Sequence, residues 1–176
     1  MDKEKWDSCV TFHGHECPGL AIGFRASQIA EEFFDRKLSP RSDEMVVCVT
    51  ENDACGVDAV QVMTGCTIGK GNLIYRSTGK MAFSFFDRDT GESIRMILKP
   101  LSESAQREEK IRFILEAPTA EVFDIGKPEF DLPEHARLFR NEICEVCGEA
   151  APEYRFHIQD GKKVCPDCFT DYSRGW

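Results

Sequence analysis

The chain has 176 residues, of which 41% are hydrophobic, and it carries a formal net charge of −9. This length fits one domain, or one domain with a small appendage. The acidic charge disfavours nucleic acid and anionic membranes as partners, and no apolar run approaches the roughly 20 residues that span a bilayer. Because the first residues lack the apolar core of a secretion signal, we expect a cytoplasmic protein.

The cysteines divide the chain into two parts. There are nine of them, and an odd number without a secretion signal favours metal ligation or reactive thiols over a disulfide framework. Five lie between residues 9 and 66, and four lie in the last 33 residues. This division predicts two domains, residues 1–140 and 141–176.

A short segment ahead of the first long helix gathers two histidines and a cysteine. It contains His13, His15 and Cys17, and helical spacing follows from Leu20 to about Phe34. Because Pro18 suits the first turn of a helix, Cys17 should lie at the helix N-terminus, where the dipole and free N–H groups favour a thiolate. A thiolate beside imidazoles indicates a metal site or a nucleophile. The alternative is a tight turn with a structural cysteine.

A second cysteine has a similar setting further along the chain. After a turn at residues 38–43, the apolar segment Met45–Thr50 predicts a central strand. A polar turn with Cys55 follows, and a short helix is expected to begin near Val57. Cys17 and Cys55 would then lie near two helix N-termini and could meet in space.

Two cations are candidate ligands for an anion. The glycine-rich segment Thr64–Asn72 is not a Walker A loop, because only three residues separate Gly65 from Gly69 and a glycine follows the lysine where Ser or Thr is needed. An anion-binding turn that uses Lys70 is one interpretation, and a flexible lid or tight connector is another. Arg25 could turn back from the first long helix toward an anionic ligand, or pair with a surface Glu.

The middle of the chain predicts a sheet with further helices. A hairpin turn at residues 87–92 joins the second and third of four strands. A helix with Ser102 as its N-cap, a proline-rich linker from residue 126, and a short connecting helix at residues 133–141 complete this part. The strands are expected at residues 72–77, 80–87, 93–99 and 119–125, and the helix at residues 102–116.

The last four cysteines form two C-x2-C pairs. Cys144 and Cys147 are separated by 17 residues from Cys165 and Cys168. Two such pairs joined by a hairpin make a tetrahedral sulfur cage that suits Zn²⁺, with iron as the rival metal. Four thiolates leave no open position, so the zinc would be structural. A segment of about 35 residues depends on the metal for its fold, and its acidity favours protein docking over nucleic-acid binding.

Two long motifs resemble a known family. FHGHECPGLAIGFR (residues 12–25) and ENDACGVDAVQVMTGCTIGKGNL (residues 51–73) are similar to the E-subunit (FmdE) family of formylmethanofuran dehydrogenase. The C-terminal cysteine pairs resemble the zinc-ribbon or treble-clef domain of many members. The resemblance implies an α+β domain, with a mixed, mainly antiparallel sheet and packed helices, and a homodimer. It also implies association with molybdenum or tungsten formylmethanofuran dehydrogenase, which reduces CO₂ to a formyl group.

The resemblance also assigns residues. By position, His15, Cys17 and Cys55 correspond to metal or active-site residues, and His13 is a candidate for supporting them. Which histidine is a ligand stays open, and so does the metal, Zn²⁺ or another transition metal. The family therefore suggests a metal-binding accessory protein of a molybdenum or tungsten oxidoreductase. The alternatives are an enzyme that uses Cys17 or Cys55 with His15 on a small substrate, and a zinc-ribbon docking module.

Overall fold

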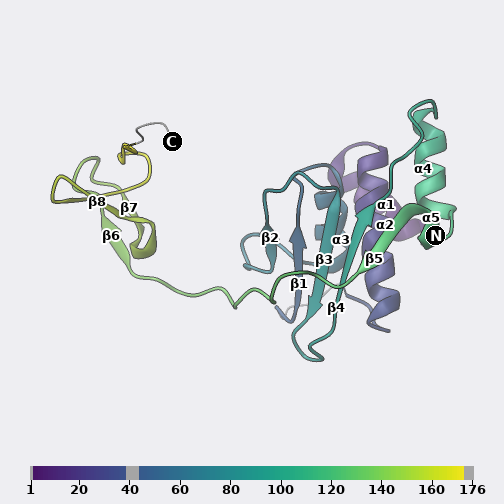
Figure 1. Cartoon of the computed structure of the whole chain (residues 1–176), viewed down its shortest axis with the longest axis horizontal. Coiled ribbons are helices and arrows are strands. Elements are labelled where there is room, and N and C mark those ends of the chain that lie inside the picture. The colour runs from purple at the N-terminus through teal and green to yellow at the C-terminus, as the bar shows by residue number, and fades with distance from the viewer. Residues whose placement is uncertain (1, 39–43, 173–176) are drawn as a thin grey trace. The chain divides into compact units, whose positions relative to one another are not determined.

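The computed structural model describes residues 2–38 and 44–172 (Figure 1). The chain forms two compact units, Met1–Ala136 and Arg137–Trp176. The turn predicted at residues 38–43 lies almost entirely outside the described residues. Among the helices of the described segments, none is both long and apolar enough to cross a membrane.

The first unit is built on one mixed sheet, with the strand order β2-β1-β3-β4-β5 (Figure 1). β1 and β2 are parallel, and the other three pairs are antiparallel. The predicted α+β class with a mainly antiparallel sheet is therefore confirmed. The strands are β1 (Val46–Thr50), β2 (Leu73–Tyr75), β3 (Ala82–Asp87), β4 (Ser93–Leu98) and β5 (Phe123–Gly126).

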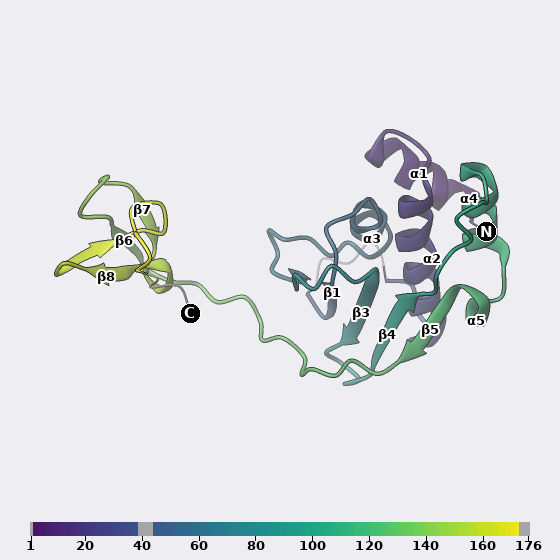
Figure 2. The ribbon, with the colours of Figure 1, turned by 45° about the horizontal axis from the view of Figure 1, so that its top comes forward.

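Helices α1, α2 and α3 cover one face of this sheet (Figure 2). Alternate residues of β1 point to opposite faces, so Cys48 packs in the main core with these helices, while Val49 joins a smaller cluster on the other face. Phe130 and Leu132, from the segment after β5, pack against that smaller cluster. The helices are α1 (Lys3–His13), α2 (Pro18–Phe33), α3 (Gly56–Thr64), α4 (Arg107–Glu116) and α5 (Thr119–Val122).

Two predicted helix features were wrong. Helix α4 begins at Arg107 rather than after Ser102, and its N-cap is Gln106, whose backbone N–H donates to the Glu109 carboxylate at 3.0 Å. In this capping-box contact the side chain at N3 accepts from the backbone N–H of the N-cap residue. Phe33, which its apolar spacing assigned to the core side of α2, is 45% exposed, whereas Phe34 directly after it is buried.

The segment after α4 also differs from the prediction. The predicted strand at residues 119–125 is divided, because Glu121 N–H donates to the Pro118 carbonyl and forms the short helix α5 before β5. The predicted helix at residues 133–141 is absent from this described part of the chain. Its residues are mostly exposed, and a short helix without a packed face is not stable in water.

The second unit consists of two small hairpins around buried cysteines. Asp160 and Gly161 have φ values of 50° and 77°, the left-handed conformation of a tight hairpin turn. The small core of this unit contains Cys144, Val164 and Cys165. The elements are β6 (Asn141–Ile143), β7 (Ala150–Pro152), the 3-10 turn η1 (Glu153–Arg155), β8 (His157–Gln159) and β9 (Lys162–Val164).

Candidate metal centres

Glycines let helices α2 and α3 pack with their backbones in contact. A Cβ atom on Gly23 would lie 1.9 Å from the carbonyl oxygen of Gly56, and one on Gly56 would lie 2.9 Å from that of Gly19. This close approach places the N-termini of the two helices together. Cys17 and Cys55 are the N-cap residues of α2 and α3, so the contact brings the two thiols to the same place, as the sequence suggested.

His13, Cys17 and Cys55 form a candidate metal site in the first unit. One ligand atom from each lies within 4.8 Å of the others, and His13 Nε2 is 3.7 Å from Cys17 Sγ. Zinc bonds of about 2.0 Å to nitrogen and 2.3 Å to sulfur would hold these two atoms about 3.5 Å apart in a tetrahedron. The Leu20 N–H donates to Cys17 Sγ at 3.2 Å. The sulfur is thus already held in an electropositive position.

Asp58 orients the histidine of this group. Its Oδ2 lies 2.7 Å from His13 Nδ1. If Nδ1–H donates to this carboxylate, the lone pair of Nε2 is directed toward Cys17. Metal-binding histidines commonly donate their second ring N–H to a carboxylate, which fixes the tautomer in this way. Sequence patterns could not reveal this pair, because 45 positions separate the two residues.

The thiol of Cys55 is poorly suited to act as a free nucleophile. Burial, the Cys17 sulfur and the negative charge of Asp58 raise the pKa of Cys55, and only its own backbone N–H opposes them. Two neighbouring sulfurs cannot both ionise easily without a cation. A metal ion removes this penalty, because it binds the thiolate directly. The electrostatics therefore favour metal ligation over the nucleophile interpretation.

A cavity of about 520 Å³ adjoins two of the three residues, His13 and Cys55. His13 and Cys55 line it together with Asp53, Ile68 and Tyr75. This volume lies within the usual range for small-molecule sites. A metal held by three protein ligands keeps one position for water or another ligand, and this cavity offers space for that ligand.

The other residues proposed from the sequence lie outside this group. His15 is exposed, and its ring centroid is 4.6 Å from that of His13. Arg25 Nη2 donates to Thr119 Oγ1 at 3.3 Å, on the short helix α5. Lys70 lies in a turn in which its backbone N–H donates to Thr67 Oγ1 at 3.2 Å. Neither Arg25 nor Lys70 belongs to the lining of the cavity beside His13 and Cys55.

The four C-terminal cysteines converge in the second unit. Their sulfurs lie within 4.8 Å of one another, and Cys147 Sγ is 3.8 Å from Cys165 Sγ. A tetrahedron with zinc–sulfur bonds of about 2.3 Å has edges of about 3.8 Å. The backbone N–H groups of Cys147 and Cys165 lower the pKa of Cys144 to about 6, which favours its thiolate. This donor set fits zinc and leaves no open position, so the site is structural.

Together the two units define a metal-binding protein with a helix-covered α+β domain and a four-cysteine zinc finger. The family described as "FmdE, Molybdenum formylmethanofuran dehydrogenase operon" matches residues 12–124, and the chain belongs to this family. The "Prokaryotic dksA/traR C4-type zinc finger" matches residues 137–174. The first match contains the His13, Cys17 and Cys55 group, and the second contains all four C-terminal cysteines.

Two individual proteins are similar along most of the chain. A crystal structure of an FmdE-like protein of the tungsten formylmethanofuran dehydrogenase type, from Syntrophus aciditrophicus, superposes with a TM-score of 0.67 at 25% identity, covering 94% of this chain and 90% of that one. A "Probable S-adenosyl-L-methionine-binding protein" of Archaeoglobus fulgidus is 32% identical over 92% of this chain. The chain spans about half of that relative, 51% of its length.

Proposed function

We propose that the protein is a metal-binding accessory protein whose second metal is held by His13, Cys17 and Cys55. In this proposal the metal is Zn²⁺ or another transition metal, and its open position faces the neighbouring cavity. The observation that carries the proposal is the convergence of three ligand atoms within 4.8 Å, with Asp58 2.7 Å from the nitrogen of His13 that faces away from the sulfurs.

The family supports a role for this metal site beside molybdenum or tungsten enzymes. Membership in the FmdE family supports a role beside a formylmethanofuran dehydrogenase or a related one-carbon oxidoreductase, with its subunits as partners and the chain itself a homodimer. A stand-alone enzyme is the weaker candidate, because burial and neighbouring charges raise the pKa of Cys55. A zinc finger that only docks to partners would not account for the His13–Asp58 contact, which lies in the first unit.

Metal content tests the proposal, and His15 supplies a matched control for His13. We expect about two metals per chain in the full protein, one of them lost in His13→Ala and in Cys17→Ser. His15→Ala removes an exposed imidazole next to the site and should keep both metals. The measurement is elemental mass spectrometry on protein purified without an affinity metal, with folding checked by circular dichroism.

The outcome also decides between the two histidines. A Cys144→Ser variant should lose the structural zinc and keep the metal at His13, because the two sites lie in different units. A single metal that disappears only in Cys144→Ser would contradict the proposal. Loss of the second metal in His15→Ala, with His13→Ala still loaded, would transfer the ligand role to His15.

The Archaeoglobus relative suggests one occupant for the cavity. Its name supports S-adenosyl-L-methionine as a second candidate ligand of this chain, and the volume of about 520 Å³ is within the range of small-molecule sites. Equilibrium dialysis of the metal-loaded protein with labelled S-adenosyl-L-methionine measures this directly. Saturable binding that a Tyr75→Ala change weakens would assign the ligand to this cavity, and no saturable binding would remove the candidate.

A further inference from the structure

A second, strongly polar cavity lies beyond the end of β1, on the sheet face opposite α1, α2 and α3. Val49 and Glu51 alternate with the core-facing residues of this strand, so the Glu51 side chain is directed to this face. The cavity has a volume of about 180 Å³, and its lining is Glu51, Arg76, Thr78, Lys80, Arg95, Glu129 and Phe130.

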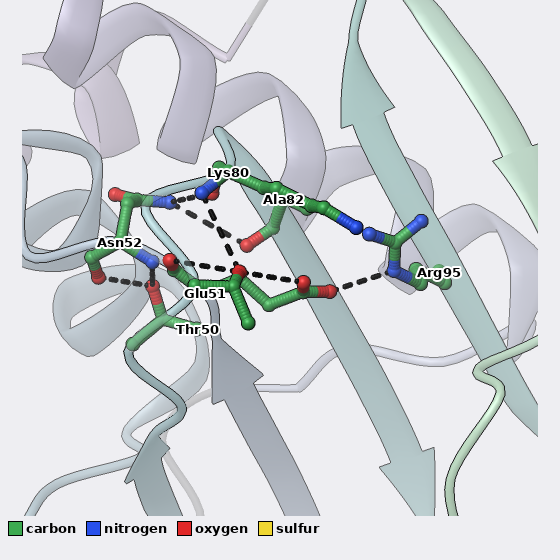
Figure 3. Close-up of polar contacts among 7 residues, drawn as sticks. Thr50, Glu51, Asn52, Lys80, Ala82 and Arg95 are labelled. Atoms are coloured by element: carbon green, nitrogen blue, oxygen red, sulfur yellow. Dashed lines mark hydrogen bonds and ion pairs between the residues drawn. The ribbon is translucent and has the colours of Figure 1, made fainter. Parts of the chain in front are cut away.

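Glu51 holds one cation of this cavity in place. Its side chain is 1% exposed. Its carboxylate accepts from Arg95 Nε at 2.7 Å (Figure 3) and from Thr78 Oγ1 at 2.9 Å. Since only Nε of the guanidinium is engaged, its two terminal nitrogens donate to no protein group among residues 2–38 and 44–172. A guanidinium fixed at one edge and free at the other is ready to bind an anion.

Two further cations line the same cavity. The Arg76 guanidinium lies 4.6 Å from the centroid of the Phe130 ring, which limits its movement by a cation–π contact. The Lys80 side chain extends toward the guanidinium of Arg95 (Figure 3). Within the described residues, no carboxylate forms an ion pair with Arg76 or Lys80.

The charge around the cavity is therefore unbalanced. Three cations face the buried Glu51 and the exposed Glu129, although the whole chain carries a net charge of −9. Like charges gathered around a small cavity repel one another. An anion in the cavity would offset this repulsion and accept hydrogen bonds from several directions.

We propose that this cavity binds a phosphate group, with Arg76, Lys80 and Arg95 donating to its oxygens. The volume is smaller than the roughly 300 Å³ at which pockets for whole ligands begin, so it fits one compact group. Three cationic donors, two from the connection between β2 and β3 and one from β4, suit a doubly charged phosphate better than a singly charged carboxylate. The group is either free phosphate or the terminal group of a ligand that extends outside.

The site is separate from the His13 metal site. Thr50 and Asn52 line the cavity beside the metal ligands, while Glu51 between them lines the phosphate cavity. The two sites therefore lie on opposite sides of one short segment. Phosphate binding does not require the metal, and it can be tested with metal-site variants.

Calorimetric titration with inorganic phosphate at low ionic strength tests the proposal. We expect one saturable site in the full protein, weakened at least tenfold in Arg76→Met and in Lys80→Met. Lys3→Met makes the same chemical change at an exposed lysine of α1 and should bind as the parent does. Cys17→Ser should also bind unchanged, because its change lies at the other site.

Comparison of ligands identifies the source of the group. Equal affinity for phosphate and glycerol phosphate would indicate that the ligand is the free ion. Tighter binding of glycerol phosphate would indicate that the ligand is the terminal phosphate group of a larger molecule. Either result supports the proposed site. No saturable binding, equal weakening in Lys3→Met, or unchanged affinity in Arg76→Met and Lys80→Met would overturn the proposal. Tighter binding of acetate than of phosphate would overturn the choice of anion.

Discussion

At the scale of single residues, the direction of the His13 ring decides what the first unit can bind. Asp58 lies in the first turn of α3 and contacts Nδ1 at 2.7 Å. The nitrogen that remains, Nε2, is 3.7 Å from Cys17. His15 is only two positions away but is exposed. The neighbouring carboxylate, rather than the histidine motif, therefore distinguishes the two imidazoles.

Glu51 should make stability depend on acid pH. Burial raises its pKa, but hydrogen bonds from Arg95 and Thr78 and the charges of Arg95 and Arg76 lower it more strongly, below the ordinary 4.5. A carboxyl whose folded pKa is lowered stabilises the fold above its unfolded pKa, and this contribution is lost as the pH falls through the folded pKa.

The corresponding variant is Glu51→Gln. At pH 7 we expect its free energy of unfolding to be about 3 kcal/mol lower than that of the parent, because Arg95 loses its partner in a buried pair. The difference should shrink as the pH falls below about 4.5. Urea unfolding at several pH values measures it, with the exposed Glu108→Gln as control. A difference that does not change with pH would contradict the ion-pair explanation.

At the scale of secondary-structure elements, the contact between α2 and α3 creates the metal site. Gly19 and Gly23 are four residues apart on one side of α2, and Gly56 begins α3. Since a Cβ on Gly23 would lie only 1.9 Å from a backbone oxygen of Gly56, the helices could not keep this distance with any larger residue. The close packing of these two helices therefore also determines where Cys17 and Cys55 lie.

Gly23→Ala should consequently damage both stability and metal binding. Alanine in a helix interior normally stabilises by about 1 kcal/mol relative to glycine. Here we expect destabilisation of about 2–3 kcal/mol, because the new methyl group separates two backbones. The metal at Cys17 and Cys55 should be lost while the structural zinc remains. Thermal unfolding and metal analysis measure the two effects.

Gly69 offers the matched control for this change. A Cβ on Gly69 would meet no atom within 4 Å, so Gly69→Ala should keep parental stability and both metals. A Gly23→Ala protein as stable as the parent, with its second metal still bound, would show that the helices can separate without harm to the site.

At the scale of the whole molecule, the two units differ in what stabilises them. The first unit has a large apolar core between its helices and sheet. The second has three buried core residues, two of which are cysteines of the sulfur cluster. So few apolar contacts cannot offset the entropy of ordering the chain, so metal binding must supply the stability of the finger.

Metal removal should therefore unfold one unit and not the other. After treatment with a strong chelator, we expect trypsin to cut between the two cysteine pairs, at Arg155, Lys162 and Lys163, while residues 2–136 remain protected apart from their exposed ends. Cuts at Arg137 and Arg140, which lie in the exposed segment ahead of the finger, do not report its unfolding. Mass spectrometry of the fragments locates the cuts. The His13→Ala protein is the control, since its finger keeps its zinc and should resist cleavage. A finger that stays protected after verified zinc loss would contradict this assignment.

The sequence by itself determined the features that depend on local spacing. Two C-x2-C pairs at hairpin distance are sufficient to predict a four-sulfur zinc site, because each pair already places two thiolates on one turn. Helix α2 was predicted from its apolar spacing and from Pro18 at its first position. The family motifs around Cys17 and Cys55 also predicted the fold class, and the structure confirms it.

Tertiary structure alone decided the features that join distant segments. The pair of His13 and Asp58, and the contact of Gly23 with Gly56, depend on how α1, α2 and α3 pack. The three cations of the polar cavity come from β4 and from the segment between β2 and β3, which the sequence does not place side by side. Local patterns specify turns and helices, but a site assembled across the sheet is defined by packing.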